Sequence, residues 1–361
     1  MLEVMDGPKV RVLIVDDSDF VRTVIRAALS SHPQIEVVGE APDGVEGIRM
    51  VARLRPDVVT LDVEMPRMNG ITVLERAAGK VPVGFLMVST LTQAGARVTF
   101  EALQKGALDY ITKPTQGMAA QRGFRHELCE KVLAASRAKG RKSILRCAAS
   151  GPSAAPSLPP NQVKGWVVAI GISCGGPQTL TKMLPAFPSD FPPILIAQHM
   201  PAQFTGSFAK HLDEMCSMNV REAQDGDKPT PGTVLIAPGH SHMKLKRRGI
   251  EIAVHLDAGA KVTGHRPAAD AMFDSVARTY GPRAVGVVMT GMGEDGAAGV
   301  TRMSQAGAWT IAQDEASSLV YGMPKAAVAA GGVDEVVGLQ EIPKAIAALM
   351  QRGTRVAAVR A

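Results

Sequence analysis

Short apolar runs alternate with longer amphipathic stretches in the first third of the chain. The runs are rich in Val, Leu and Ile and lie at residues 10–15, 58–61, 83–88 and 110–112. The stretches between them have helical periodicity and lie at residues 20–30, 44–54, 70–77 and 97–105. Nearly all-apolar short runs are typical of strands buried on both faces of a parallel sheet. The alternation therefore predicts a doubly wound parallel α/β sheet, whose ligands bind beyond the carboxyl ends of the strands.

Polar residues with distinct chemistry follow each of these predicted strands. Asp16 and Asp17 follow the first strand, Asp62 the second, Ser89 the third and Lys113 the fourth. Three carboxylates at one sheet edge repel one another unless a divalent cation lies among them, and oxygen ligands favour Mg²⁺. Asp62 could then attack a phosphoryl group, and Lys113 and Ser89 could hold its oxygens. One Asp after a strand is more often a helix cap, but the combination favours a phosphorylation site.

Three motifs here resemble the flavodoxin-like receiver domain of two-component response regulators, over residues 9–114. They are Val-Asp-Asp-Ser at 15–18, Leu-Asp-Val-Glu-Met-Pro-Arg-Met-Asn-Gly at 61–70 and Thr-Lys-Pro at 112–114. The resemblance implies that Asp62 is the phosphoacceptor and that Mg²⁺ binds Asp16, Asp17, Asp62 and the backbone carbonyl of Glu64. It also implies that Ser89 and Tyr110 rearrange on phosphorylation, with Lys113 beside the phosphoryl group.

A chain of 361 residues normally forms about two domains. After Pro114 the apolar periodicity fades, Arg and Lys recur from Arg122 to Arg146, and a Pro- and Ser-rich stretch follows at 151–160. We therefore expect a receiver domain at 1–120, a basic linker at 121–160 that is partly helical at 126–137, and a catalytic domain at 161–355.

The second half of the chain repeats the strand-end pattern with different chemistry. An apolar run at 165–170 leads into Gly-Ile-Ser-Cys-Gly, a G-x-S-x-G turn that can expose the hydroxyl of Ser173 at a helix start. A run at 193–197 ends near His199, and a run at 284–289 leads into a glycine-rich loop with Asp295. A serine nucleophile needs a base, and the base needs a carboxylate. The three strand ends could supply a Ser-His-Asp triad.

Other elements and another histidine must be weighed against this assignment. Further strands are expected at 233–237, 309–312 and 333–337, helices at 324–330 and 342–351, and an inserted β-hairpin spanning 243–254. The order of α/β-hydrolase triads places His last, which would require Asp257 with His265. Those two lie away from any predicted strand edge, so we prefer His199 and Asp295. The remaining candidates lack matched partners and are interpreted as surface or packing residues: His240, His242 and Tyr280.

Nearly the whole chain resembles the bacterial chemotaxis receptor methylesterases. The matching segments are those at 171–176, 197–201, 236–239, 265–267, 290–296 and 305–309. The resemblance implies Ser173 as nucleophile, His199 as general base, Asp295 as orienting acid and Met292 at the oxyanion site. Cys174, beside the nucleophile, stands where that family usually has Thr or Ala.

The same resemblance implies the reaction and its partners. The substrates would be methylated glutamates of methyl-accepting chemotaxis receptors, which lose methanol, with glutamine deamidation as a second activity. A chemotaxis histidine kinase would be the phosphodonor. Mg²⁺ would serve receiver phosphorylation, and ester hydrolysis would need no cofactor.

Composition limits the rival functions. The formal net charge of +6 is concentrated partly in the expected linker, but no helix-turn-helix pattern follows, so we expect no nucleic-acid binding. The four cysteines lack CxxC spacing, and no apolar run reaches the roughly 18 residues of a membrane span. Residues 1–9 contain no apolar core of a signal peptide, so we expect a cytoplasmic protein that is not a membrane protein. A catalytically inactive binding regulator and a DNA-acting response regulator rank below the esterase.

Overall fold

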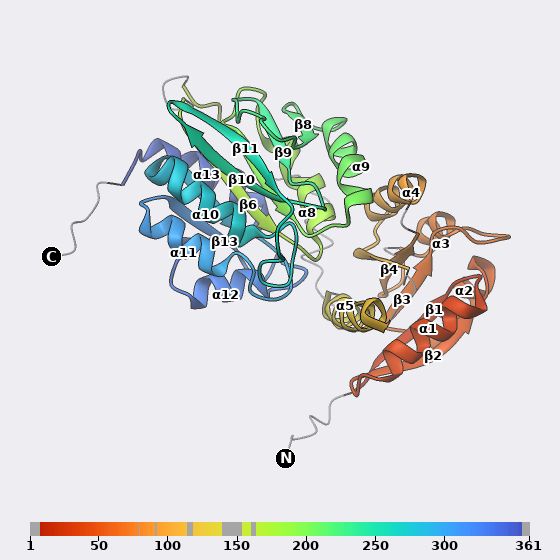
Figure 1. Ribbon diagram of the computed structural model, residues 1–361. Coiled ribbons are helices and arrows are strands. Elements are labelled where there is room, and N and C mark those ends of the chain that lie inside the picture. Colours follow the sequence, from red (N-terminus) through yellow and green to blue (C-terminus); the bar gives the residue numbers. More distant parts are fainter. Residues whose placement is uncertain are drawn as a thin grey trace, which may run out of the picture. The chain divides into compact units, whose positions relative to one another are not determined.

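The computed structural model describes residues 8–78, 80–90, 92–113, 118–138, 154–159 and 164–355. The chain divides into two compact units, Met1–Lys142 and Ser143–Ala361 (Figure 1). Each unit has its own parallel sheet, which agrees with the expected α/β class. Within the described residues, no helix combines the length and the apolar character needed to cross a lipid bilayer.

The first unit is built on a five-stranded parallel sheet in the order β2-β1-β3-β4-β5. Its strands are β1 (Val10–Val15), β2 (Ile35–Ala41), β3 (Val58–Asp62), β4 (Gly84–Ser89) and β5 (Asp109–Thr112). The apolar pattern predicted four of them. It missed β2, because this edge strand is only partly buried and carries polar residues that blunt an exposed edge.

Four helices of this unit begin at polar side chains that accept backbone hydrogen bonds. The caps are Ser18, Asp43, Asn69 and Thr92. They start α1 (Asp19–Ser30), α2 (Gly44–Leu54), α3 (Gly70–Ala77) and α4 (Gln93–Gln104). An oxygen at such a position satisfies amide groups that the first helical turn leaves without partners. The helix after β1 is therefore capped by Ser18, which leaves Asp16 and Asp17 for other chemistry.

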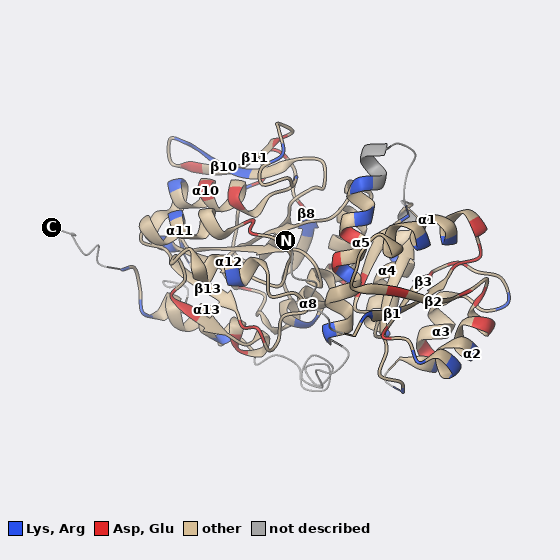
Figure 2. Cartoon of the chain, turned by 90° about the horizontal axis from the view of Figure 1, so that it is seen from below, with Lys and Arg blue, Asp and Glu red and all other residues tan. Residues whose placement is uncertain are grey.

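The expected linker begins too early at residue 121. Residues Met118–Ala138 form a long helix, α5, which packs on α1 and β4 and buries Phe124, Leu128 and Val132. The first unit accordingly extends to Lys142. The sequence pattern predicted a helix only at 126–137 and assigned it to the linker, because many basic and acidic side chains lie along α5 (Figure 2). Of the remaining expected linker, 139–153 and 160 lie outside the described residues.

The second unit contains a seven-stranded parallel sheet in the order β14-β13-β12-β6-β7-β9-β8. Its strands are β6 (Val167–Ile172), β7 (Ile194–Gln198), β8 (Asn219–Glu222), β9 (Thr233–Ile236), β12 (Ala284–Val288), β13 (Trp309–Gln313) and β14 (Glu335–Val337). The chain places β7, β8 and β9 on one side of β6 and then crosses to β12 on the other side. That reversal next to β6 is a topological switch point, where ligands of doubly wound sheets bind.

Helices and one hairpin complete this unit. The helices are α8 (Gly176–Met183), α9 (Ala202–Asp213), α10 (Ala269–Tyr280), α11 (Ala297–Gln305), α12 (Met323–Ala329) and α13 (Ile342–Gln351). The inserted hairpin is confirmed as antiparallel β10 (His242–Arg248) and β11 (Glu251–Asp257). It packs against α10, and Leu245 and Val254 share one buried core with Phe273.

Candidate active site and phosphorylation site

Ser173 lies directly after β6, at the carboxyl edge of the seven-stranded sheet. Gly175 takes a left-handed conformation with φ 74° and starts α8, so the chain turns sharply around the serine. The end of β12 braces this turn: the Ser173 N–H donates to the Thr290 carbonyl at 2.9 Å, and Thr290 Oγ1 donates to the Cys174 carbonyl at 2.9 Å. The nucleophile candidate is thus held by backbone contacts to a neighbouring strand.

His199 joins Ser173 and Asp295 in a line of hydrogen bonds. Its Nδ1 lies 3.0 Å from Ser173 Oγ, and its Nε2 lies 2.7 Å from Asp295 Oδ2. A carboxylate can only accept, so Nε2 carries the proton and the unprotonated Nδ1 faces the serine hydroxyl. The three residues predicted from separate strand ends therefore meet, in the arrangement that a general base and its orienting acid require.

Asp295 is held at the N-terminus of α10. Its side chain is almost fully buried, and it accepts hydrogen bonds from the backbone N–H groups of Ala269 at 2.6 Å and Asp270 at 3.1 Å. Burial alone would raise the pKa of Asp295, but the hydrogen bond from His199 and these backbone donors together lower it. The carboxylate therefore stays ionised at neutral pH and can stabilise a protonated His199.

The loop that carries Met292 lies against the nucleophile. A Cβ atom at Gly291 would come 2.9 Å from Ser173 Cβ, so only glycine fits beside the serine there. The Gly291 carbonyl accepts from Gly322 and Met323 at 3.0 and 2.8 Å, which fixes the loop. Within the described part of the chain, the Met292 N–H donates to no acceptor. That amide is therefore available to a ligand, whereas the Ser173 N–H is already used.

Sequence reasoning missed the polar residues that support this geometry. The Gln198 side chain donates to the carbonyls of Ser173 and His199, both at 3.0 Å, and ties the ends of β6 and β7 together. Gln313 Oε1 accepts from the Thr290 N–H at 2.9 Å. Both glutamines are buried, and each is the polar last residue of a strongly apolar strand, which is the signal that could have identified them.

The alternative pair, Asp257 with His265, does not form in the structure. Asp257 Oδ2 pairs with Lys244 Nζ at 2.6 Å, while His265 stacks on the ring of His199. The other candidates behave as expected of surface or packing residues. His240 is exposed, and His242 is buried with Nε2 3.0 Å from the Ala260 carbonyl. The last, Tyr280, packs partly buried against the core of this unit.

The receiver unit collects its acidic residues at the carboxyl ends of β1 and β3. Carboxylate oxygens of Asp16, Asp17 and Asp62 lie within 4.8 Å of one another. Lys113 Nζ lies 2.8 Å from Asp62 Oδ2 and 3.0 Å from Asp16 Oδ2. Asp16 and Asp62 are buried and Asp17 is exposed. The predicted nucleophile, its acidic neighbours and the predicted lysine are therefore brought together.

The acidic cluster fits a divalent cation. Burial, reinforced by the charge of Asp16 and opposed by Lys113, raises the pKa of Asp62 from 3.8 to about 6. Asp16 Oδ2 is buried and accepts no hydrogen bond, since Lys113 approaches it at ion-pair distance but outside hydrogen-bond geometry. An oxygen-ligated ion such as Mg²⁺ would relieve the repulsion and could bind this oxygen. The carbonyl of Glu64 as a further ligand stays a prediction.

The two expected switch residues are buried. Ser89 Oγ accepts from Thr99 Oγ1 of α4 at 2.9 Å and is fully buried. Tyr110 is also buried, which raises the pKa of its hydroxyl, and Lys131 Nζ lies 5.2 Å from its ring centroid. In this structure Ser89 contacts α4, so a rearrangement toward the phosphoryl group would have to break the Thr99 contact. Pro114 lies outside the described residues.

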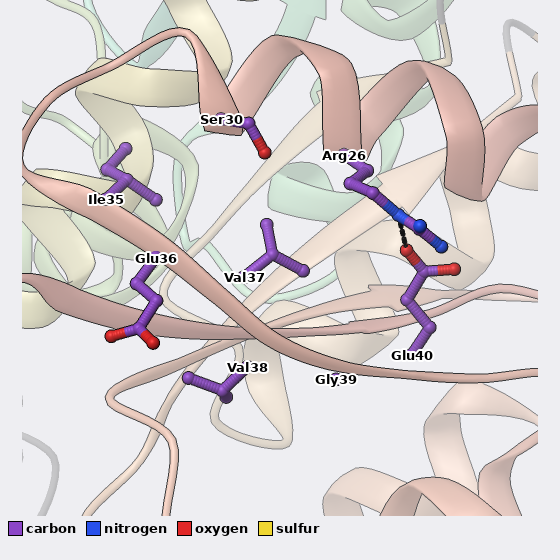
Figure 3. A pocket seen from close by; sticks show the side chains of 8 residues that line it. All are labelled: Arg26, Ser30, Ile35, Glu36, Val37, Val38, Gly39 and Glu40. Carbon is purple, nitrogen blue, oxygen red and sulfur yellow. Dashed lines mark hydrogen bonds and ion pairs between the residues drawn. The ribbon is translucent and has the colours of Figure 1, made fainter.

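A separate hollow lies between α1 and the edge strand β2 of the receiver unit. Its lining comprises Arg26, Ser30 and residues 35–40, and Arg26 forms an ion pair with Glu40 across it (Figure 3). It contains no predicted site residue. The chemistry is therefore concentrated at the two sheet edges described above.

Comparison with known proteins identifies the family of each unit. The CheB methylesterase family model matches residues 168–346, and the response regulator receiver domain model matches residues 12–120. The protein-glutamate methylesterase/protein-glutamine glutaminase 2 of Cupriavidus pinatubonensis is 45% identical over 97% of this chain and 99% of its own length. The corresponding protein of Pyrococcus abyssi is 45% identical over 95% and 94%.

A solved structure supports the catalytic fold. The crystal structure of the Thermotoga maritima CheB methylesterase catalytic domain is 39% identical, with a TM-score of 0.50, and covers 53% of this chain and 100% of its own. The chain thus joins a response-regulator receiver to an α/β esterase domain. It belongs to the CheB methylesterase family.

Proposed function

We propose that this chain is a phosphorylation-activated protein-glutamate methylesterase that acts on methyl-accepting chemotaxis receptors and serves adaptation. The observation that carries the proposal is the hydrogen-bonded line from Ser173 Oγ through His199 to Asp295. The relatives that are named for this activity align with nearly the full length of the chain. Glutamine deamidation at receptor sites follows the same chemistry and is part of the proposal.

The reaction follows from the direction of the hydrogen bonds. Ser173 Oγ attacks the γ-carbonyl carbon of the methylated glutamate while His199 Nδ1 takes its proton. The Met292 N–H stabilises the oxyanion, and ionised Asp295 stabilises the imidazolium. The tetrahedral intermediate collapses when His199 returns the proton to the departing methoxide, which leaves as methanol. Water, activated by the same histidine, then hydrolyses the acyl-enzyme to free glutamate; from glutamine the leaving group is ammonia.

The receiver unit regulates the esterase activity. Asp62 is the proposed phosphoacceptor, and a chemotaxis histidine kinase is the proposed donor. Mg²⁺ held by Asp16, Asp17 and Asp62 would neutralise charge at this site when bound. Lys113 lies within reach of the phosphoryl group, and Ser89 would exchange its Thr99 contact for a phosphoryl oxygen.

Phosphorylation then shifts the population of an inhibited arrangement toward an active one. A tenfold activation requires only about 1.4 kcal/mol of differential free energy between the two arrangements. One phosphoryl group with its new charge-assisted hydrogen bonds can supply a free energy of this size.

Methanol release from methylated receptor fragments tests the proposal. The native chain should release methanol, and faster with a small phosphodonor and Mg²⁺. Ser173→Ala should lower turnover by roughly four to six orders of magnitude, because triad residues act as a unit. Ser189→Ala, which removes an exposed hydroxyl of the same domain, should leave turnover unchanged. Near-normal methanol release by Ser173→Ala would refute the site, and no release by the native chain would favour a binding regulator.

A further inference from the structure

The helices α10 and α11 pack side by side, and both begin beside Asp295 (Figure 1). The residue before each helix, Ala268 for α10 and Gly296 for α11, has no side-chain oxygen that could accept hydrogen bonds from the first helical turn. Buried amide groups without partners cost free energy, so the N–H groups of both first turns need acceptors from elsewhere. Each helix receives its acceptor from the start of the other.

Two aspartates supply these acceptors reciprocally. Asp295, which precedes α11, accepts from the N–H groups of Ala269 and Asp270 in the first turn of α10. Asp270 Oδ1 in turn accepts from the Gly299 N–H in the first turn of α11 at 2.5 Å. The oxygen of Asp295 that binds Ala269, Oδ2, is also the one that binds His199 Nε2. The orientation of the triad carboxylate therefore depends on how the two helix starts are joined.

Close packing of the two helices leaves no room for a substitute acceptor. A Cβ atom at Gly299 would lie 2.8 Å from Phe273 Cβ and 2.9 Å from Asp270 Oδ1, so glycine allows α11 to approach α10 this closely. The Asp270 side chain is buried between them. Loss of its carboxylate would therefore leave the Gly299 N–H without a partner and release the start of α11, to which Asp295 is directly connected.

The negative charge of Asp270 does not account for its position. Burial raises the pKa of Asp270, the Gly299 N–H lowers it, and the charge of neighbouring Asp295 raises it again, with a smaller opposing effect of Arg302. A carboxylate is thus disfavoured at this place by burial and by repulsion from Asp295. An uncharged oxygen acceptor would avoid both effects and could still bind the Gly299 N–H. The hydrogen bond is therefore the contribution that the site requires.

From these contacts we infer that Asp270 is a positioning residue that holds Asp295 in line with His199 by fixing the start of α11 against α10. The inference rests on the proposed esterase function. It requires an oxygen acceptor at position 270 and not a charge. Because Asp270 acts on the reaction through Asp295, its removal should matter only while the Asp295 carboxylate is present.

Two variants of the full-length chain separate these roles. Asp270→Ala should lower kcat for methanol release about 10- to 100-fold, because small misplacements of catalytic groups cost rates of this order. KM should stay within about twofold, since Asp270 acts on the triad and not on substrate. Asp270→Asn retains the acceptor for Gly299 and should keep kcat within about threefold of native. The matched control is Asp334→Ala, which removes an acceptor of the Thr310 N–H at the opposite edge of the same sheet and should lower stability without changing kcat.

A double-mutant cycle tests whether Asp270 acts through Asp295. The readout is the rate at which a fluorophosphonate labels Ser173, because this rate reports triad geometry without any receptor. Asp270→Ala should slow labelling about 10- to 100-fold in the native background and less than about threefold in the Asp295→Ala background. If the native chain labels at Ser173 but releases no methanol, the proposed substrate is wrong and the inference is judged on labelling alone.

Three results would overturn the inference. They are an unchanged rate for Asp270→Ala, a loss for Asp270→Asn as large as that for Asp270→Ala, and an equal loss in both backgrounds of the cycle. Melting temperatures identify any variant that fails to fold. If Asp270→Ala does not fold, Gly299→Ala replaces it, because the added methyl group forces α11 away from Asp270 while the carboxylate remains. The same loss in the labelling rate is expected, and an unchanged rate would again refute the inference.

Discussion

Replacing Asp62 by Asn should stabilise the receiver unit at neutral pH in the absence of divalent cations. Asp62 is buried beside Asp16, and its pKa in the folded chain is about 6 against an ordinary value of 3.8. Folding therefore favours the protonated Asp62 carboxyl. Ionisation of Asp62 in the folded chain lowers the free energy of unfolding. At 1.36 kcal/mol per pKa unit the cost is about 3 kcal/mol, an upper limit because Asn also removes the bond from Lys113.

The sign of the pH dependence follows from the raised pKa. Above about pH 6 the carboxylate is ionised in both states, and the folded chain bears the full cost. As the pH falls from about 6 toward 3.8, the folded chain takes up a proton first and the cost disappears. Asn never ionises. The stability difference between Asp62→Asn and native should therefore be about 1 to 3 kcal/mol near pH 8 and close to zero near pH 4.

Hydrogen exchange of β3 peptides, followed by mass spectrometry, measures this difference in the full-length chain. Glu36→Gln removes an exposed carboxylate from β2 and serves as the control, with no expected change. Mg²⁺ should stabilise native protein more than Asp62→Asn, because the ion offsets the repulsion that the variant lacks. A variant less stable than native near pH 8, or a difference that does not depend on pH, would refute this account of the acidic cluster.

Three further outcomes test the remaining assignments. Asp295→Asn should lower kcat about 10⁴-fold with the fold intact by circular dichroism, because an amide favours the wrong tautomer of His199; a loss below tenfold would remove Asp295 from the triad. A small phosphodonor with Mg²⁺ should label native protein but not Asp62→Asn, and labelling of the variant would place the phosphoacceptor elsewhere. A fragment beginning at Ser143 should release methanol faster than the unphosphorylated full chain and ignore phosphodonor; equal activity would exclude inhibition by the receiver, and lower activity would mean that the receiver recruits substrate.

The sequence predicted the two sheets and the residues at their edges, because strand ends in a parallel sheet converge whatever the loops do. Ser173, His199 and Asp295 each follow a strongly apolar strand, so their meeting could be anticipated. The edge strands β2 and β8 were missed and the last receiver helix was expected too short, since exposure dilutes their apolar pattern. The place of His265 could not be anticipated, because it depends on how a loop folds back over a distant strand end.

The three triad residues follow β7, β6 and β12, which are immediate neighbours in the sheet. Backbone pairing of Ile172 with Gln198 sets the separation of Ser173 and His199, and the backbone N–H groups of Ala269 and Asp270 hold Asp295. Interstrand hydrogen bonds keep this part of the sheet rigid. A regulatory unit could therefore not displace the triad residues without disrupting the central strands of the domain. Control of such an enzyme must therefore act on access to the serine. An inhibitor small enough to pass should label Ser173 equally well whether or not the receiver is phosphorylated, and only bulky substrates should sense the switch.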